Sequence, residues 1–185
     1  MSNSKKSIIS KKLSRFFTER KFNSEYKNYS PQAKKFNDFI KNSIDFIFLM
    51  PTDEKTFAEA IIIPTYIKIH KKNTTLILPE YFINSISNKN GYTFISYFPQ
   101  TFEKLGFATD DFLSVVSQKR YDVFFDLTPE ENLFTSSLSL KINADFKIAL
   151  FKKEKTKIYN MLFNEEPANI LEKSFENLLN SIRMF

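Results

Sequence analysis

Glycine is nearly absent from this sequence: the 185 residues include only two, Gly91 and Gly106. Loops that cradle a phosphate need several glycines, because their backbone N–H groups must approach the ligand closely. A G-x-G-x-x-G fingerprint and a Walker-type loop are therefore both excluded.

Cysteine is absent and histidine occurs once. The lack of cysteine excludes disulfides, cysteine–zinc sites, iron–sulfur clusters and thiol nucleophiles. The single histidine, His70, precedes Lys71 and Lys72 at the expected end of a helix, where a cationic side chain suits the helix dipole. We expect a structural role for His70, no metal site and no cofactor.

Long apolar runs are missing as well. No segment approaches the ~20 apolar residues of a membrane-spanning helix, and the N-terminus lacks the apolar core of a signal peptide. We therefore expect a cytoplasmic protein.

Hydrophobic residues make up 42% of the chain and include 22 phenylalanines, which is ample for a core. The length suits one α/β domain with an appendage. We expect a leader over residues 1–29 and one domain over residues 30–185.

The net charge of +6 is unevenly distributed. Residues 1–35 carry ten Lys and Arg against two Glu, a net +8, whereas the other 150 residues carry 17 against 19, a net −2. A globular nucleic-acid-binding protein more often carries its positive charge on the folded domain. The excess of positive charge therefore lies in the leader and the few residues after it, and not in the rest of the domain.

The leader reads as a basic amphipathic helix over residues 5–22. Ile9, Leu13, Phe16 and Phe17 share one helical face. The basic side chains of the leader are Lys5, Lys6, Lys11, Lys12, Arg15, Arg20 and Lys21. Such a segment can dock on a protein, including its own domain, lie on an anionic membrane or contact nucleic acid, and the three interpretations stay open.

After the leader, apolar strand patterns alternate with helical patterns about five times. The predicted strands are residues 44–50, 74–78, 92–98, 121–127 and 146–151. The predicted helices are residues 31–42, 52–70, 79–86, 107–119, a segment starting at Thr128, and 167–184. This order predicts an α/β fold with a Rossmann-like, doubly wound, mostly parallel sheet.

The central stretch is residues 120–140, RYDVFFDLTPEENLFTSSLSL. Its apolar run is typical of a strand buried on both faces. Thr128 is the expected cap of the next helix, with Pro129, Glu130 and Glu131 in its first turn. Earlier, Thr52 takes the same role, and Pro64 is expected to kink the helix that follows or to restart it.

Residues 121–151 resemble a stretch of the family 9 glycosyltransferases, the heptosyltransferase-like enzymes of lipopolysaccharide synthesis. Asp122, Asp126, Leu127 and the strand 147–151 match that stretch in kind and order. The strand IDFIFLM and its proline-containing helix resemble the start of the same family. The resemblance covers about residues 44–151 and implies the N-terminal Rossmann-like half of a two-domain GT-B enzyme.

The family's functional residues are not matched. The resemblance implies a Gly-Asp pair after the first strand, whose aspartate activates the acceptor hydroxyl, but alignment on Pro64 places Phe57 and Ala58 there. The family's nucleotide-sugar-binding half has no counterpart after residue 151. We therefore expect no glycosyl transfer by this chain alone.

Ligands of open parallel sheets bind beyond the carboxyl ends of the strands. The expected rim consists of Pro51, Thr52, Asp53, Thr128, Glu130 and Glu131. The weak candidates for a catalytic carboxylate are Asp53, Glu54 and Asp126. Carboxylates at helix starts also serve as caps, which is their commoner role.

The sequence favours a non-catalytic Rossmann-like protein that acts through contacts with an unidentified protein partner or with itself. The leader is expected to tether it, with an anionic membrane surface as a further attachment through residues 5–22, peripheral to the inner membrane. One alternative is a component of a split glycosyltransferase that needs a separate nucleotide-sugar domain. The second is a nucleic-acid-associated protein with a basic tail.

Overall fold

A parallel sheet forms the centre of the chain, of which the computed structural model describes residues 16–31, 40–102, 106–150, 152–163 and 171–184. Its strands are β1 (Asp45–Leu49), β2 (Asn73–Pro79), β3 (Tyr92–Tyr97), β4 (Tyr121–Asp126), β5 (Ala144–Leu150) and β6 (Met161–Phe163). They lie in the order β3-β2-β1-β4-β5-β6, and all neighbours run parallel. This confirms the predicted doubly wound α/β fold, with β6 as an additional strand.

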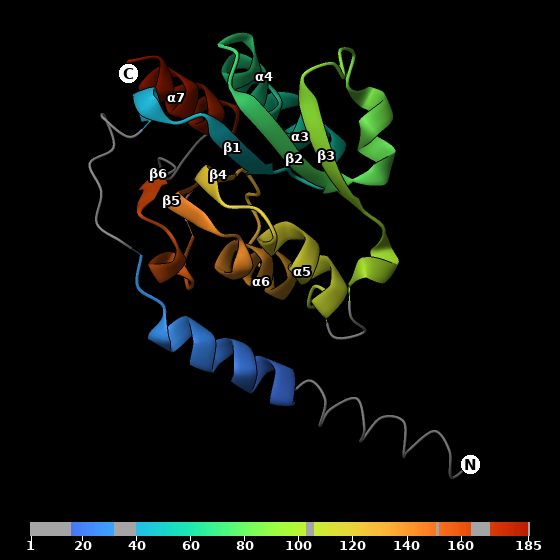
Figure 1. The fold of residues 1–185 in the computed structure, drawn as a ribbon, viewed down its shortest axis with the longest axis vertical. Helices are drawn as coiled ribbons and strands as arrows, with labels where there is room; N and C mark the ends of the chain where they lie inside the picture. The colour runs from blue at the N-terminus through green and yellow to red at the C-terminus, as the bar shows by residue number, and fades with distance from the viewer. Residues whose placement is uncertain (1–15, 32–39, 103–105, 151, 164–170, 185) are drawn as a thin grey trace.

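Helices cover both faces of the sheet, so the domain has three layers (Figure 1). One face packs against α3 (Glu54–Ala60), α4 (Ile62–Ile69), the 3-10 segment η1 (Glu80–Ser85) and α7 (Leu171–Arg183). The other packs against α5 (Asp110–Ser117) and α6 (Leu133–Lys141), and a helix over residues 16–28 lies on the outer side of these two helices. The described residues also include two short 3-10 turns, η2 (Pro99–Thr101) and η3 (Thr156–Ile158), and a helical segment at residues 40–42.

The two central strands are apolar on both sides because both faces are covered. Phe46 and Phe48 of β1 point toward α3, α4 and α7, whereas Ile47 and Leu49 point toward α5 and α6. Phe48 stacks on Phe125 of β4 with ring centroids 5.1 Å apart and planes 5° from parallel. The apolar residues of these two runs thus contribute alternately to the cores on the two faces of the sheet.

Two predicted helix starts are wrong. Asp53, not Thr52, caps α3, because its carboxylate accepts the Thr56 N–H at 2.9 Å. The helix expected from Thr128 begins at Leu133 instead, capped by Asn132 in a capping box with Thr135. Residues 128–131 form a turn that is tied to another loop of the domain.

The pattern over residues 52–70 forms two helices, so the helix restarts close to Pro64, which is one of the two outcomes expected there. α3 ends at Ala60, and Ile61 is both the C-cap of α3 and the N-cap of α4. Pro64 lies in the first turn of α4, where its missing N–H costs no helical hydrogen bond. His70 is the C-cap of α4, and its ring Nδ1 lies 2.9 Å from the Tyr66 carbonyl oxygen. This places His70 at a helix end, as predicted.

The helix over residues 16–28 lies against the face covered by α5 and α6 (Figure 1). Phe22 is only 5% exposed, and its ring centroid lies 6.2 Å from that of Phe107. The Tyr26 hydroxyl donates to the Glu154 carbonyl at 3.0 Å. The described part of the leader is therefore folded onto the domain.

The docked face of this helix differs from the predicted one. Phe16 and Phe17 are 57% and 62% exposed, so they do not pack on the domain. Ile9 and Leu13 lie outside the described residues, as do Lys5, Lys6, Lys11, Lys12 and Arg15. Phe22 and Tyr26, one turn further along, make the contact instead.

We predict that Phe22→Ala lowers the free energy of unfolding by about 3 kcal/mol, because it empties a buried aromatic site. The matched control Phe17→Ala removes an exposed ring and is expected to change the free energy by less than about 0.5 kcal/mol. Urea denaturation of both variants measures the difference. Equal effects would contradict the docked position of Phe22.

Candidate functional site

The predicted rim lies where β1 and β4 end side by side. These strands are neighbours at the point where the strand order reverses, which is where doubly wound sheets bind their ligands. A crevice at this point is lined by Pro51, Thr52, Asp53, Thr128, Pro129, Glu130, Asn132 and Thr135. The structure thus brings five of the six predicted rim residues together.

The crevice is nearly closed. Its free volume is about 10 Å³, which leaves room for at most one water molecule. Asn132 and Thr135, which sequence reasoning missed, narrow it from the start of α6. The sequence could have indicated them, because Asn132 and Thr135 are polar residues three positions apart, which is the spacing of a capping box.

Asp126 lies beneath this crevice and is 1% exposed. Its Oδ1 accepts the backbone N–H of Thr128 at 3.0 Å and the Thr128 hydroxyl at 2.5 Å. Its Oδ2 accepts the hydroxyls of Tyr159 at 2.5 Å and Ser139 at 3.3 Å. Both carboxylate oxygens are therefore engaged by groups of the chain itself.

Lys152 supplies the positive charge for Asp126. Its ammonium lies 3.4 Å from Asp126 Oδ2, and both side chains are almost fully buried, 2% and 1% exposed. The same ammonium donates to the carbonyl of Thr128, and to its hydroxyl at 3.2 Å. The buried ammonium of Lys152, which has three N–H donors, thus holds the turn after β4 against the loop after β5.

Tyr159 completes the network as a hydroxyl donor. Burial, and next the negative charge of Asp126, raise the pKa of Tyr159 well above its ordinary value. The phenol consequently stays protonated and donates a hydrogen bond to the carboxylate. A protonated donor in this closed position orders the fold, and the arrangement offers no open lone pair to a substrate.

Asp53 occupies the exposed side of the crevice. Hydrogen bonds from the side chain and then the backbone of Thr56 lower its pKa, so the carboxylate stays charged at the start of α3. Glu54 is exposed and lines a different groove, of about 390 Å³, between α3, α4 and η1. Asp53, Glu54 and Asp126 thus lie in three different surroundings, and the structure does not bring them together as a catalytic group.

Glu131 acts as a cap for a distant loop. Its carboxylate accepts the backbone N–H groups of Lys153 and Glu154 at 3.0 Å each and of Lys155 at 2.6 Å. Consecutive backbone N–H groups of this kind form an anion-binding nest. Here the protein fills the nest with its own carboxylate.

The positions aligned with the glycosyltransferase Gly-Asp pair lie inside α3. Phe57 is 4% exposed and stacks on Phe82 with ring centroids 4.3 Å apart. Ala58 follows it in the same helix. A packed helix occupies the place where the resemblance implies a flexible turn.

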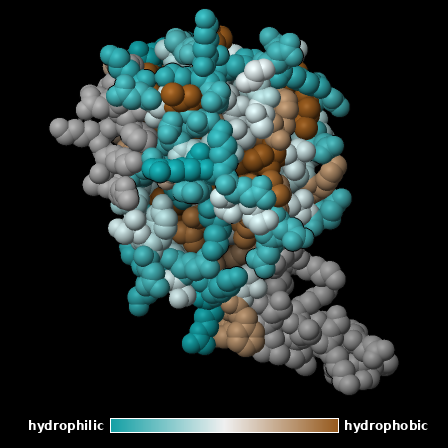
Figure 2. Space-filling view, in the orientation of Figure 1, coloured by the Kyte–Doolittle hydropathy of each residue, from teal (hydrophilic) through white to brown (hydrophobic). Residues whose placement is uncertain are grey.

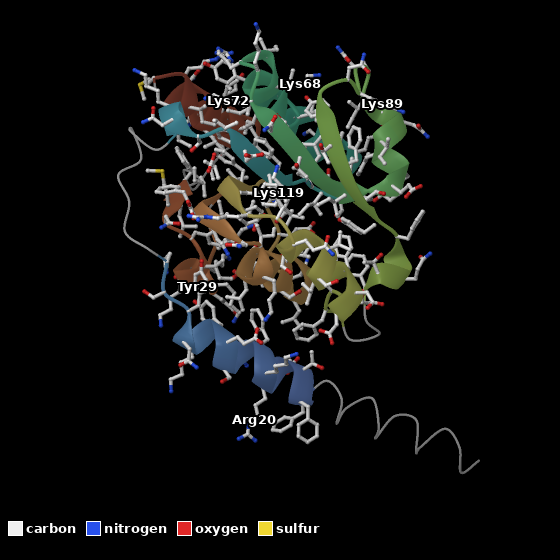
Figure 3. The ribbon with its side chains drawn as sticks, viewed as in Figure 1. Arg20, Tyr29, Lys68, Lys72, Lys89 and Lys119 are labelled. Carbon is white, nitrogen blue, oxygen red and sulfur yellow. The ribbon has the colours of Figure 1, made fainter. Side chains whose placement is uncertain are left out.

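The leader cations that the structure describes point into solvent. Arg20 and Lys21 are both exposed, and Arg20 points away from the domain (Figure 3). In the described ranges, no three His, Asp or Glu side chains gather as a metal site requires. No helix in those same ranges is long and apolar enough to cross a membrane.

Sequence reasoning also missed Lys147 in β5, which is 2% exposed. Its ammonium donates to the carbonyls of Ser139 at 2.6 Å and Leu140 at 3.3 Å near the end of α6. It also lies 5.0 Å from the centroid of the Tyr29 ring. Burial lowers the pKa of Lys147 from 10.5 to about 7.

Comparison of the chain with models of known protein families gives no match, and comparison with curated proteins gives none either.

We predict that Asp126→Ala lowers the free energy of unfolding by about 3–5 kcal/mol, because the charge of Lys152 is left buried and unpaired. The milder variant Tyr159→Phe removes one hydrogen bond to the carboxylate and is expected to cost about 1.5–3 kcal/mol. Asp53→Ala, which removes an exposed helix cap, is expected to cost about 1 kcal/mol. Urea denaturation ranks the three variants, and an Asp126→Ala effect below that of Asp53→Ala would contradict the network.

From the lowered pKa of the buried Lys147 we predict that the free energy of unfolding rises with pH. The unfolded chain holds the lysine proton up to the ordinary pKa of 10.5, whereas the folded chain releases it above about 7. Between these values the unfolded state binds more protons, so the free energy of unfolding rises by up to about 1.4 kcal/mol per pH unit. Below about pH 7 the lysine is protonated in both states, so its contribution to the free energy of unfolding no longer changes with pH.

The measurement compares wild type with Lys147→Met by urea denaturation between about pH 7.5 and pH 9.5. The stability of wild type relative to the variant is expected to increase across this range. Parallel pH curves would show that Lys147 keeps its proton in the folded state.

Proposed function

We propose that this chain is a non-catalytic Rossmann-like protein that acts through protein–protein contacts, with its basic leader as a tether. The observation that carries the proposal is the closed crevice at the ends of β1 and β4, which leaves about 10 Å³. Ligand sites are usually concave spaces of about 300–1,000 Å³. The position where this fold class binds its ligand is filled by the protein itself.

The electrostatics of the crevice support the same proposal. Nucleotide phosphates bind where backbone N–H groups at a helix start are free and positive. Here the charged carboxylate of Asp53 takes the Thr56 N–H at the start of α3. Met50 and Pro51 follow β1 in place of a glycine-rich loop. A phosphate would meet negative charge and side chains instead of backbone N–H groups.

The exposed aromatic pair of the leader helix supplies a contact surface. Phe16 and Phe17 meet edge to face, with ring centroids 5.9 Å apart, and both are more than half exposed. Arg20 and Lys21 follow within the next turn. Exposed aromatic rings beside cations are a common composition of protein-binding surfaces.

The test is recovery of the tagged full-length chain from its own cells at moderate salt, with bound molecules identified by mass spectrometry and absorbance. We expect a stoichiometric protein partner, whose recovery falls at least about fivefold in Phe16→Ser/Phe17→Ser. Val115→Ser is the matched control, because Val115 is 46% exposed on α5 and does not line the groove between α5 and the leader helix.

Three results would separate this proposal from the other functions. Unchanged partner recovery in the Phe16→Ser/Phe17→Ser variant would contradict the leader surface. A nucleotide-sugar-binding chain, with turnover restored on mixing, would support the split glycosyltransferase instead. Recovery of nucleic acid alone, lost when Lys5, Lys6, Lys11 and Lys12 are changed to Gln, would support the basic-tail interpretation.

A further inference from the structure

Strand β3 forms one edge of the sheet and pairs, within the described chain, with β2 alone. Of its six residues only Tyr97 is buried, while the other five are partly or fully exposed. An edge strand presents unpaired backbone N–H and C=O groups along its outer side, which is a template for another strand. Phe94 and Ile95 of β3 are partly exposed, and hydrophobic atoms show through the mainly hydrophilic surface on this side of the molecule (Figure 2).

β3 lacks the features that keep most edge strands single. Its sequence, YTFISY, contains no charged residue, no proline and no glycine, and it combines aromatic and β-branched residues. The opposite edge, β6, is only three residues long, and short edge strands are one of the protective features. The two edges of the sheet therefore differ in their capacity to pair.

The two ends of β3 carry opposite charges on the same face of the sheet. At its start, the Lys68 ammonium lies 4.1 Å from the centroid of the Tyr92 ring. Toward its end, the Ser96 hydroxyl donates to the carboxylate of Glu80 at 2.9 Å. Figure 3 shows Lys68, Lys72 and Lys89 along the end of the molecule where β2 and β3 begin.

We propose that β3 pairs antiparallel with β3 of a second copy of this chain, about a two-fold axis at Phe94. In this register Tyr92 of each copy lies opposite Ser96 of the other, on the same face of the joined sheet. The Lys68 ammonium over Tyr92 is thereby brought beside the Glu80 carboxylate that contacts Ser96 of the other copy on the same face. The two-fold axis repeats this ion pair, and it joins the two sheets into one.

The charge pattern is what selects a second copy over an unrelated extended segment. In a two-fold interface the same surface of both copies meets, so residue i of one copy contacts residue j of the other and j contacts i. Opposite charges at equal distances from the axis therefore attract twice. Tyr92 and Ser96 are each two residues from Phe94, and they carry Lys68 and Glu80 respectively. This inference goes beyond the proposed function, because it needs only the purified chain and rests on β3 instead of the leader or the crevice.

The test is the mass in solution from about 1 to about 100 µM, measured by sedimentation or light scattering, a range that suits a small interface. We expect wild type to approach twice the 21.8 kDa of one chain as the concentration rises. Lys68→Glu and Glu80→Lys each place like charges together and are expected to weaken dimerisation at least about fivefold. The double variant restores opposite charges and is expected to recover wild-type association.

The matched control is Lys153→Glu/Glu154→Lys, which exchanges two exposed charges in the loop after β5 and is expected to leave the dimer unchanged. Hydrogen exchange of wild type gives a second readout that needs no variant, since the amides of residues 92–97 are expected to exchange more slowly at high concentration. A monomer throughout the range, a dimer that leaves β3 unprotected, or failure of the folded double variant to restore association would each overturn the proposal.

Discussion

One buried ion pair orders the second half of this sheet. Asp126 at the end of β4 and Lys152 after β5 lie 3.4 Å apart in the interior. Burying both charges costs several kcal/mol unless hydrogen bonds satisfy the remaining atoms. Thr128, Ser139 and Tyr159 provide those bonds to the carboxylate. The carboxylate consequently joins β4, α6 and the residue that follows η3.

The same ion pair determines what the carboxyl edge of the sheet can do. Lys152 draws the turn after β4 inward, and Asn132 and Thr135 close the space that remains beside Asp53. The carboxylates at this edge are used as caps and as internal acceptors. We therefore propose outer surfaces for the contacts of this protein, namely the leader helix with its exposed rings and the edge of β3.

Local patterns predicted most of the fold, and contacts between distant residues explain what they missed. The central strands appeared as apolar runs, because a strand covered on both faces is apolar throughout. The edge strand β3 appeared through its aromatic and β-branched residues. β6 has only three residues, too few to show a pattern. The start of α6 was misplaced because Lys152, which fixes the preceding turn, is distant in sequence from Thr128. The strand-end rule selected residues of which five lie together at the ends of β1 and β4. Whether such a place is open or filled depends on side-chain packing that no local pattern contains.

The central claim is that the crevice between β1 and β4 is filled by the protein itself. Its most direct test is a titration of the ¹⁵N-labelled full-length chain with nucleoside diphosphates and nucleotide-sugars, with and without Mg²⁺, followed through the amide signals of residues 50–56 and 127–135. The account predicts no saturable shift of these signals at ligand concentrations up to about 1 mM, where even weak sites are occupied. A saturable shift confined to these residues would show that the crevice opens to a nucleotide, and it would contradict the account.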